Sequence, residues 1–524
     1  MREVNYSILS TSQVPINRYD RSKINQTMKK LSYHLFLLVT ILFCTACKDY
    51  FDDIKPSDDL PSREIFTTAQ DLETALTGVY NSVQSLNLTS NAVPEILEAL
   101  SCNDSLVESK NQIQVEIYSL NFRSGNPHVE VIWTEAYKAI NLANRILEAL
   151  GTVQDPVFTP GMADRIKGEA LFLRGMLYFE MVRLFALPYE QGNLNKPGIP
   201  LMLTSVLTKA QIQYPARSTV QEVYSQIEKD LTEASTLLPA GNDRGRANRD
   251  VAIAYLAKVA FQKQDYATAG DKAQVLVSAY GLNDTPSEFF RNEGSGEEIW
   301  TLVNSSSDAN FFFARRVHQK ANWAKISGDL KRRGFAAIVP TFQLSAIEDA
   351  GYSVMDLRTD PEAPDPMVSD DGIYTNKYED FAGMTDDAPM ARAAEFYLMR
   401  AEALARTQGI NEESIELLNQ IRRRSLRVMN GNGAIVPNSN SYIEYMTSDF
   451  QNTDELISAI ILERRVELCF EGNYFHDLMR TKGDVYFYFS GMFTKIPYDA
   501  NRLRLPIPQR EIDANPDLVQ NPGY

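Results

Sequence analysis

Cysteine, histidine and tryptophan are scarce in this chain of 524 residues, which contains four Cys, four His and three Trp. Four cysteines are too few to hold a fold of this length together by disulfides, and four histidines supply a metal site poorly. Positively charged residues are also outnumbered: the chain has 52 Lys and Arg and 68 Asp and Glu, which gives a net charge of −16. A protein that binds duplex nucleic acid needs clustered cations, so we expect no nucleic-acid partner.

Several signatures of catalysis are missing as well. The chain has no glycine-rich phosphate loop and no G-x-S-x-G nucleophile turn. His476 stands next to Asp477, but the sequence offers no third metal ligand beside this pair. We therefore expect His476 to be structural, and we expect neither a metal nor a cofactor. The composition is ordinary for a globular protein, with 44% hydrophobic and 23% charged residues.

Residues 28–46 have the three parts of a secretory signal. A short basic segment precedes an apolar run at 35–43, and two small residues, Thr45 and Ala46, precede Cys47. The run is half as long as a membrane span, which needs roughly 18 residues. The ending resembles a bacterial lipobox, although Cys44 stands where that pattern prefers Leu. We predict a lipoprotein signal peptide over 28–46 and acylation of Cys47, with an ordinary signal peptide as the alternative.

Residues 1–27 are polar and precede a signal that is complete from Met28. We expect them to be an over-extended start or to be removed. Acidic residues follow Cys47 closely, as in lipoproteins displayed on the outer face of the outer membrane. Beyond the signal only Cys102 and Cys469 remain, and we expect both to be buried free thiols.

Most of the chain has the apolar period of amphipathic helices. Over 219–238, apolar residues recur every three or four positions, and Ser218 and Gln221 have the spacing of a capping box. Small residues on 251–262 and 266–277 allow two helices to approach closely, as in a tetratricopeptide unit. Further helices are predicted at 133–150, 166–186, 396–405 and 412–424. We predict an all-α, tetratricopeptide-like scaffold of helical hairpins over about 65–280 and 390–524.

A large, loop-rich insertion interrupts this scaffold at about 284–387, rich in Gly, Pro, Asn, Asp, Ser and aromatic residues. An irregular stretch of that length usually carries function, so we expect a ligand-facing region; an insertion that packs on itself is the alternative. Trp323 is the leading stacking candidate, because Asn322 precedes it and three Phe, including Phe312, lie upstream. A buried core position is the alternative for Trp323. Tyr374 is a further candidate.

Segments spread along the whole chain resemble the SusD/RagB family of outer-membrane nutrient-binding lipoproteins from Bacteroidetes. In order, they are 49–52, 71–83, 133–144, 168–185, 463–472, 477–481 and the closing stretch 506–524. The resemblance makes 47–524 one SusD-like domain and implies an all-helical tetratricopeptide scaffold with a variable region built onto it. It also places the stretch around Asp104 near the ligand face, which makes Asp104 a candidate ligand contact.

The resemblance also implies a function. A SusD-like protein is held on the cell surface by acyl chains, such as palmitate, on the residue that corresponds to Cys47. It captures an oligosaccharide or a peptide and delivers it to a SusC-like TonB-dependent β-barrel transporter without breaking a bond. The sequence does not separate glycan from peptide. A purely structural stabiliser of the transporter is a further reading.

A secreted glycan-degrading enzyme is the main alternative, because glycoside hydrolases work with two convergent carboxylates. Glu463, Glu467 and Glu471 recur at four-residue steps on one face of a predicted helix. They continue an apolar stripe, and buried carboxylates usually have cationic partners. We therefore expect structural ion pairs there, with Arg464 and Arg465 lying beside the carboxylates.

Overall fold

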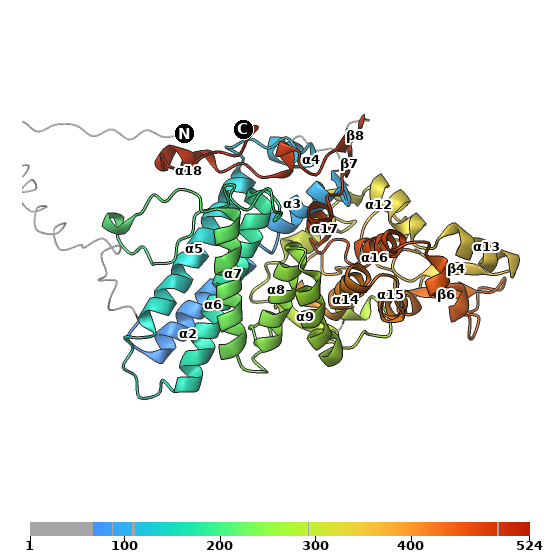
Figure 1. The fold of residues 1–524 in the computed structure, drawn as a ribbon, viewed down its shortest axis with the longest axis horizontal. Helices are drawn as coiled ribbons and strands as arrows, with labels where there is room; N and C mark the ends of the chain where they lie inside the picture. Colours follow the sequence, from blue (N-terminus) through green and yellow to red (C-terminus); the bar gives the residue numbers. More distant parts are fainter. Residues whose placement is uncertain (1–65, 86, 107–110, 292, 490–491) are drawn as a thin grey trace, which may run out of the picture. The chain divides into compact units, whose positions relative to one another are not determined.

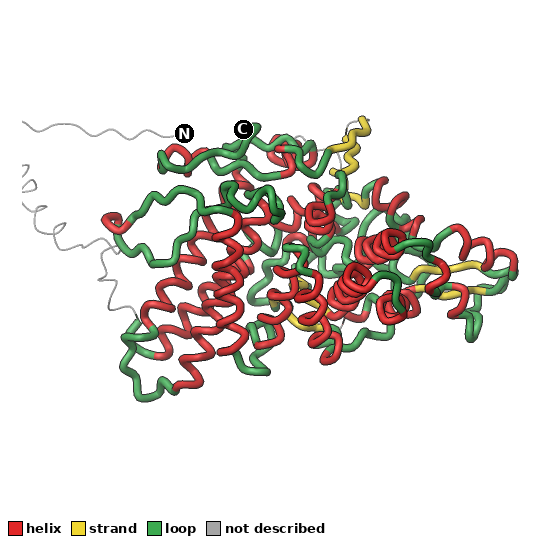
Figure 2. The backbone as a smooth tube through the Cα atoms, in the orientation of Figure 1, coloured by secondary structure: helices red, strands yellow, loops and turns green. Residues whose placement is uncertain are grey.

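The structure, a computed structural model, describes residues 66–85, 87–106, 111–291, 293–489 and 492–524 (Figure 1). The predicted signal peptide and Cys47 lie outside the described residues. No helix within the described ranges combines the length and the apolar character that crossing a membrane requires. The all-α prediction is confirmed, because helices dominate and the strands are short and paired only in twos in the described part (Figure 2).

The nine longest helices of the described chain form the scaffold, and each packs against the next. They are α2 (Ala69–Gln84), α5 (Pro127–Ala149), α6 (Pro160–Phe185), α7 (Val220–Leu237), α8 (Arg249–Gln262), α9 (Tyr266–Ala279), α14 (Ala393–Gln408), α15 (Glu412–Ser425) and α16 (Thr453–Glu467). The packed series runs from α2 to α9 and on to α14, which contacts both α15 and α16. Figure 1 shows α2, α5, α6 and α7 side by side. This series confirms the predicted stack of helical hairpins.

Local chemistry sets where the helices begin. At α7 the hydroxyl of Thr219 accepts the amide of Glu222 at 3.2 Å, and the Glu222 carboxylate accepts the amide of Thr219 at 2.8 Å. The prediction that Ser218 and Gln221 form this capping box is therefore wrong by one position. A carboxylate is a stronger acceptor than an amide oxygen at a helix N-terminus, where the partial charge is positive, and this favours the Thr219–Glu222 pair.

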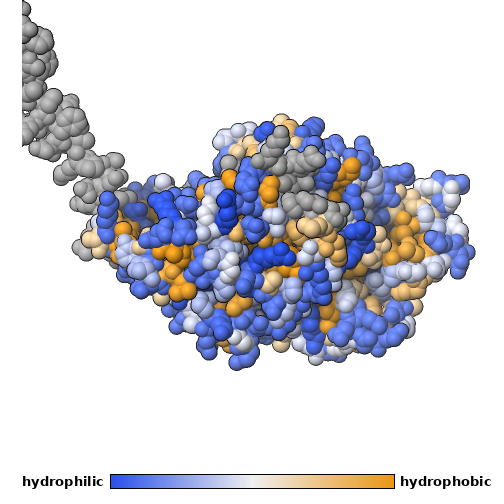
Figure 3. All heavy atoms as spheres, turned by 90° about the horizontal axis from the view of Figure 1, so that it is seen from above, coloured by the Kyte–Doolittle hydropathy of each residue, from blue (hydrophilic) through white to orange (hydrophobic). Residues whose placement is uncertain are grey.

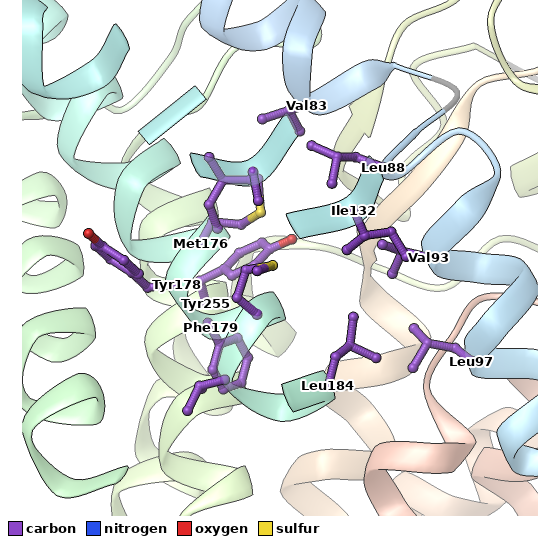
Figure 4. Close-up of a cluster of buried hydrophobic side chains, with 14 of the residues drawn as sticks. Val83, Leu88, Val93, Leu97, Ile132, Met176, Tyr178, Phe179, Leu184 and Tyr255 are labelled. Carbon is purple, nitrogen blue, oxygen red and sulfur yellow. The ribbon is translucent and has the colours of Figure 1, made fainter. Parts of the chain in front are cut away.

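The core of the scaffold is continuous from the first hairpin to the insertion. Figure 4 shows part of it, where Val83, Ile132, Met176, Phe179 and Tyr255 point toward one another from α2, α5, α6 and α8. Each of these side chains is at most 1% exposed. Full burial of one large apolar side chain contributes roughly 1.5–3 kcal/mol, so this shared core holds the hairpins in one unit.

The region between α9 and α14 is more regular than the sequence predicts. It contains α10 (Glu288–Arg291), β2 (Glu298–Leu302), α11 (Phe312–Val317), β3 (Ala324–Ile326), α12 (Gly328–Arg333), α13 (Thr341–Asp349), β4 (Ser353–Asp356) and β5 (Ala388–Arg392). Two antiparallel pairings tie it to the scaffold: β3 with β1 (Asp104–Leu106), and β4 with β6 (Leu426–Met429). β2 pairs with β5 and closes the base of the insertion. These elements are too short to show a period in the sequence.

Four further α-helices and one hairpin of the described chain lie outside the packed series. They are α3 (Ala92–Ser101), α4 (Gln112–Tyr118), α17 (Tyr474–Thr481), α18 (Gln509–Ala514) and the hairpin of β7 (Val485–Phe489) and β8 (Met492–Ile496). Cys102 and Cys469 are buried and unpaired, as predicted. On the face seen in Figure 3, hydrophilic residues predominate and hydrophobic residues form scattered patches.

Candidate functional site

Four rings and one guanidinium of the insertion form a continuous row, which we name the aromatic strip. Its members, in spatial order, are Trp323, Phe312, Arg315, Phe381 and His318. The Trp323 and Phe312 ring centroids are 5.5 Å apart. The Arg315 guanidinium carbon lies 5.8 Å from the Phe312 centroid and 5.1 Å from that of Phe381, whose ring is 5.5 Å from His318. The strip therefore has aromatic rings on both sides of a central cation. The His318 ring is buried, so Trp323, Phe312, Arg315 and Phe381 form its accessible part.

The local fold explains why these side chains meet. Phe312 and Arg315 are one turn apart on α11, and residues three apart on a helix share a face. Phe311 and Phe313, on either side of Phe312, are buried and anchor the start of α11 in the core. Trp323 directly precedes β3, which β1 holds in register. The Trp323 side chain is 38% exposed, so it lies at the surface and is not a core Trp.

Phe381 reaches the strip from a separate loop that hydrogen bonds hold in one shape. The Asp380 carboxylate accepts the amides of Gly383 at 2.7 Å and Thr385 at 3.2 Å. The Asp386 carboxylate accepts the amide of Asp380 at 2.8 Å. A loop with this many internal bonds loses little entropy when a ligand binds against it.

Asn322 and Tyr374 lie together next to the strip. The Tyr374 hydroxyl donates a hydrogen bond to the Asn322 side-chain oxygen. Asn322 is exposed and has a left-handed backbone, with φ of 54°, which turns the chain into Trp323. Tyr374 is only 8% exposed. Of the two predicted contacts, Asn322 thus presents an amide at the surface, whereas Tyr374 positions Asn322 from beneath.

Asp104 does not face the strip. It is 5% exposed and accepts the Tyr118 hydroxyl at 2.8 Å, and Arg316 donates to the same hydroxyl at 3.2 Å. Burial raises the pKa of Asp104 to about 8, against the hydrogen bond from Tyr118. Asp104 pairs with Ile326 where β1 meets β3. The structure thus places Asp104 in the interior, where it supports β3, the strand that follows Trp323.

The strip also contains residues that the sequence did not single out as contacts. Arg315 could have been found, because it stands one helical turn after Phe312 and has the spacing of a shared face. Phe381 could not, because it joins the strip only through the path of the chain from β4 to β5. Within the described residues no group of His, Cys, Asp and Glu is arranged to hold a metal ion.

Two models of known protein families match this chain. A family model described as "Starch-binding associating with outer membrane" matches residues 49–261, and the model of the SusD family matches residues 360–524. This chain belongs to the SusD family. It is accordingly a carbohydrate-binding protein and not an enzyme, and its family is one described as associating with the outer membrane.

Individual relatives agree with this assignment. The chain is 26% identical to SusD-like protein P2 of Formosa agariphila, over 95% of this chain and 100% of that protein. A SusD superfamily protein from Bacteroides fragilis has the same fold, with a TM-score of 0.72 at 22% identity over 87% of this chain and 100% of the other. A laminarin-binding SusD-like protein gives a TM-score of 0.61 at 21% identity, over 87% and 99%. The strip therefore stands on a SusD fold.

The carboxylates that favoured a glycoside hydrolase are occupied by ion pairs in this SusD protein. Glu467 is fully buried and accepts Arg392 at 2.8 Å and Arg358 at 3.1 Å, with Arg424 also paired to it. Burial alone would raise the pKa of Glu467, but Arg424, Arg392 and Arg358 hold it well below its ordinary value. A carboxylate fixed in this way is a structural anion, as predicted, and it has no access to a sugar bond.

The flanking carboxylates have similar surroundings. Glu463 pairs with Arg358 at 2.6 Å, and Glu471, which lies beyond the end of α16, pairs with Arg392 at 2.8 Å. The sequence favoured Arg464 and Arg465 as the partners of these carboxylates, and that prediction is wrong. Arg464 instead pairs with Asp477 at 3.1 Å, and Arg465 with Asp329 at 2.7 Å.

His476 is a buried residue of α17. Its side chain packs against Phe475, with ring centroids 5.7 Å apart. Burial, together with Arg183 and Lys258, holds the pKa of His476 well below its ordinary value, so its ring is neutral. A neutral imidazole in the core of the SusD scaffold fits the structural role that the sequence predicts.

Proposed function

We propose that this protein captures an oligosaccharide on the aromatic strip at the cell surface and delivers it to a TonB-dependent β-barrel transporter of the SusC type. The observation that carries the proposal is the exposed Trp323 ring beside Phe312, on an insertion held to the scaffold by β1 and β6. The mechanism is binding and handover, with no bond made or broken.

The chemistry of the strip suits a sugar. Pyranose rings have apolar C–H faces that stack on aromatic planes, and their hydroxyls need donors and acceptors at the rim. Trp323 supplies a plane, Asn322 an amide and Arg315 a fork of N–H donors, all within one short segment. A peptide could use the same rings, with polar groups directed at its backbone, and it remains the second ligand class to be tested.

The comparisons support a glycan over a peptide. The family model over the first half of the chain is described as starch-binding, and one relative of the same fold binds laminarin. Laminarin binding is a property of that relative. For this chain it supports only the broader class of oligosaccharide ligands.

The proposed location depends on Cys47. Acylation of this residue would tether the chain at the outer membrane, within reach of a barrel transporter, and one acyl chain alone gives only marginal membrane binding. The predicted lipoprotein pathway adds further chains to the same cysteine. The description of the family as associating with the outer membrane supports this placement.

Affinity electrophoresis of the soluble form, residues 48–524, through gels that contain single polysaccharides tests the proposal, with a peptide library assayed in parallel. Retardation by at least one polysaccharide, reduced in Trp323→Ala, is the expected result. Binding to peptides alone would change the proposed ligand from an oligosaccharide to a peptide, and binding to neither would overturn capture.

Two further assays test the alternatives. New reducing ends released from a polysaccharide above background would indicate an enzyme. If deletion abolishes uptake and Trp323→Ala restores it fully, the protein acts only as a stabiliser of the transporter.

A further inference from the structure

Charge is distributed very unevenly around the aromatic strip. Residues 312–334, which include Trp323, contain seven Lys or Arg and one acidic residue, Asp329, in a chain whose net charge is −16. Such a cluster of cations in an acidic protein is expected to have anionic partners, either carboxylates of the protein itself or groups of a ligand.

Internal partners account for only two of the seven cations. Arg316 is buried and pairs with Glu95 at 2.8 Å, and Arg333 pairs with Asp329 at 2.7 Å. The other five have no ion pair with any residue that the structure describes; they are Arg315, Lys320, Lys325, Lys331 and Arg332.

Arg315 is the central cation, and two rings flank its guanidinium. Its guanidinium lies between the rings of Phe312 and Phe381, 5.8 Å and 5.1 Å from their centroids. It makes no hydrogen bond to a residue of the described ranges, so its N–H donors remain available to a ligand. A guanidinium presents a planar fork that matches a carboxylate or a sulfate group with two parallel hydrogen bonds.

Two lysines extend this positive surface beyond Arg315. Lys320 is exposed and follows His318 in the turn that leads to Trp323. Lys325 is the middle residue of β3, between buried Ala324 and Ile326, so its side chain points to the opposite face of the strand, away from the core. The segment thus presents separate cations before and after the Trp323 ring.

The nearby acidic groups do not neutralise these cations. Glu379 lies 3.1 Å from Arg291 and is paired with it. Asp371 lies close enough to Lys331 for the lysine to lower its pKa slightly, but hydrogen bonds from Ser369 and the amide of Ile373 are the main causes of that lowered pKa. Arg315, Lys320 and Lys325 keep their charges uncompensated within the described part of the chain.

We propose that the aromatic strip selects an acidic oligosaccharide, with carboxylate or sulfate groups placed on Arg315 and its neighbouring lysines while a sugar ring stacks on Trp323. This inference rests on the proposed capture function and names its substrate class. The negative charge of the protein as a whole repels polyanions, so the selectivity comes from this segment alone.

The experiment uses the soluble form, residues 48–524, and matched polysaccharide pairs. Polygalacturonate and its fully methyl-esterified form give the carboxylate pair, and dextran sulfate and dextran give the sulfate pair. Affinity electrophoresis at two salt concentrations compares the wild type with Arg315→Gln, which removes the charge and keeps most of the size. Arg502→Gln is the control, because Arg502 is an exposed arginine on a different segment and the charge change is the same.

We expect at least one acidic member to retard the wild type five times or more as strongly as its neutral counterpart. Added salt should weaken this preference, because it screens exposed charges. Arg315→Gln should remove most of it, whereas Arg502→Gln should preserve it. Equal retardation by both members of each pair, or equal losses in the two variants, overturns the acidic class and leaves neutral capture standing. Failure of every polysaccharide, in a wider neutral panel as well, overturns the proposed function itself.

Discussion

The Trp323 indole and the Phe312 ring lie 5.5 Å apart with 48° between their planes. This tilted contact supports one face of the indole and leaves the side chain 38% exposed. Phe312 in turn is fixed by the burial of Phe311 and Phe313 on either side of it. The rigidity of the pair matters for binding, because a ring that is already positioned loses less freedom when a ligand stacks on it.

Replacement of Trp323 by Ala should weaken glycan binding about tenfold or more, which corresponds to roughly 1.4 kcal/mol. The free energy of unfolding should change little, because the side chain is outside the core. Phe342→Ala is the matched control: Phe342 is an exposed aromatic residue of α13, 51% accessible, and no member of the strip. Isothermal titration calorimetry with the polysaccharide found by electrophoresis checks both. Similar losses in the two variants would contradict a site at the strip.

Replacement of Glu467 by Gln should destabilise the protein by about 3–5 kcal/mol, because three buried arginines lose their common anion. Glu416→Gln removes an exposed carboxylate that pairs with Arg423, and we expect it to cost less than about 1 kcal/mol. Chemical denaturation of both variants measures the difference. A Glu467→Gln protein of normal stability would mean that the ion-pair cluster contributes nothing to the fold.

The scaffold was predictable because long helices repeat their apolar period many times. The segments predicted at 251–262 and 266–277 are α8 and α9, each extended by two residues at one end. The aromatic strip was only partly predictable. Trp323 and Phe312 are close in sequence, whereas Phe381 arrives through strand pairings between segments too short to show a period.

The ion-pair cluster shows a second limit of sequence reasoning. Glu463, Glu467 and Glu471 were recognisable as buried anions, but their cations could not be chosen from neighbours in the sequence. Consecutive residues on a helix point about 100° apart, so Arg464 faces away from Glu463 and meets Asp477 instead. Arg358 arrives from the strand region of the insertion, through contacts that only the folded chain creates.

Two glycines of α6 should respond differently to replacement by Ala. A Cβ on Gly168 would lie 2.9 Å from the Leu238 side chain, where α7 packs closely, so Gly168→Ala should destabilise by roughly 1–3 kcal/mol. A Cβ on Gly161 meets nothing within 4 Å, so Gly161→Ala should be neutral or stabilising by less than about 1 kcal/mol. Thermal unfolding compares the two. Equal effects would show that α6 and α7 are free to separate.

Cys47→Ala should abolish acylation and release the protein from membranes, because the thiol that carries the acyl chains is gone. Cys44→Ala is the matched control, since it removes a cysteine of the same signal but leaves Cys47 in place. Membrane fractionation and labelling with a palmitate analogue measure the outcome in the native host. Retention of the Cys47→Ala protein in the membrane, or loss of labelling in Cys44→Ala, would count against the predicted anchor.

Asp104 makes a pH-dependent contribution to stability that an amide should remove. Burial raises its pKa from 3.8 to about 8, so between these values the folded protein holds a proton that the unfolded chain releases. The contribution of Asp104 to the free energy of unfolding is therefore greatest at low pH. It falls as the pH rises toward 8, by up to about 1.4 kcal/mol per pH unit.

In the wild type, the Asp104 side chain accepts a hydrogen bond from the Tyr118 hydroxyl at 2.8 Å. The Asp104→Asn side chain is neutral at every pH and still has an oxygen that can accept this bond. The stability of this variant relative to the wild type should increase steadily from pH 5 to pH 8. Asp513→Asn, at an exposed position on α18, should follow the wild type over the same range. Denaturant titrations at three pH values measure the slopes. If Asp104→Asn and the wild type lose stability in parallel, Asp104 is already ionised in the folded protein, and the β1–β3 pair tolerates that buried charge.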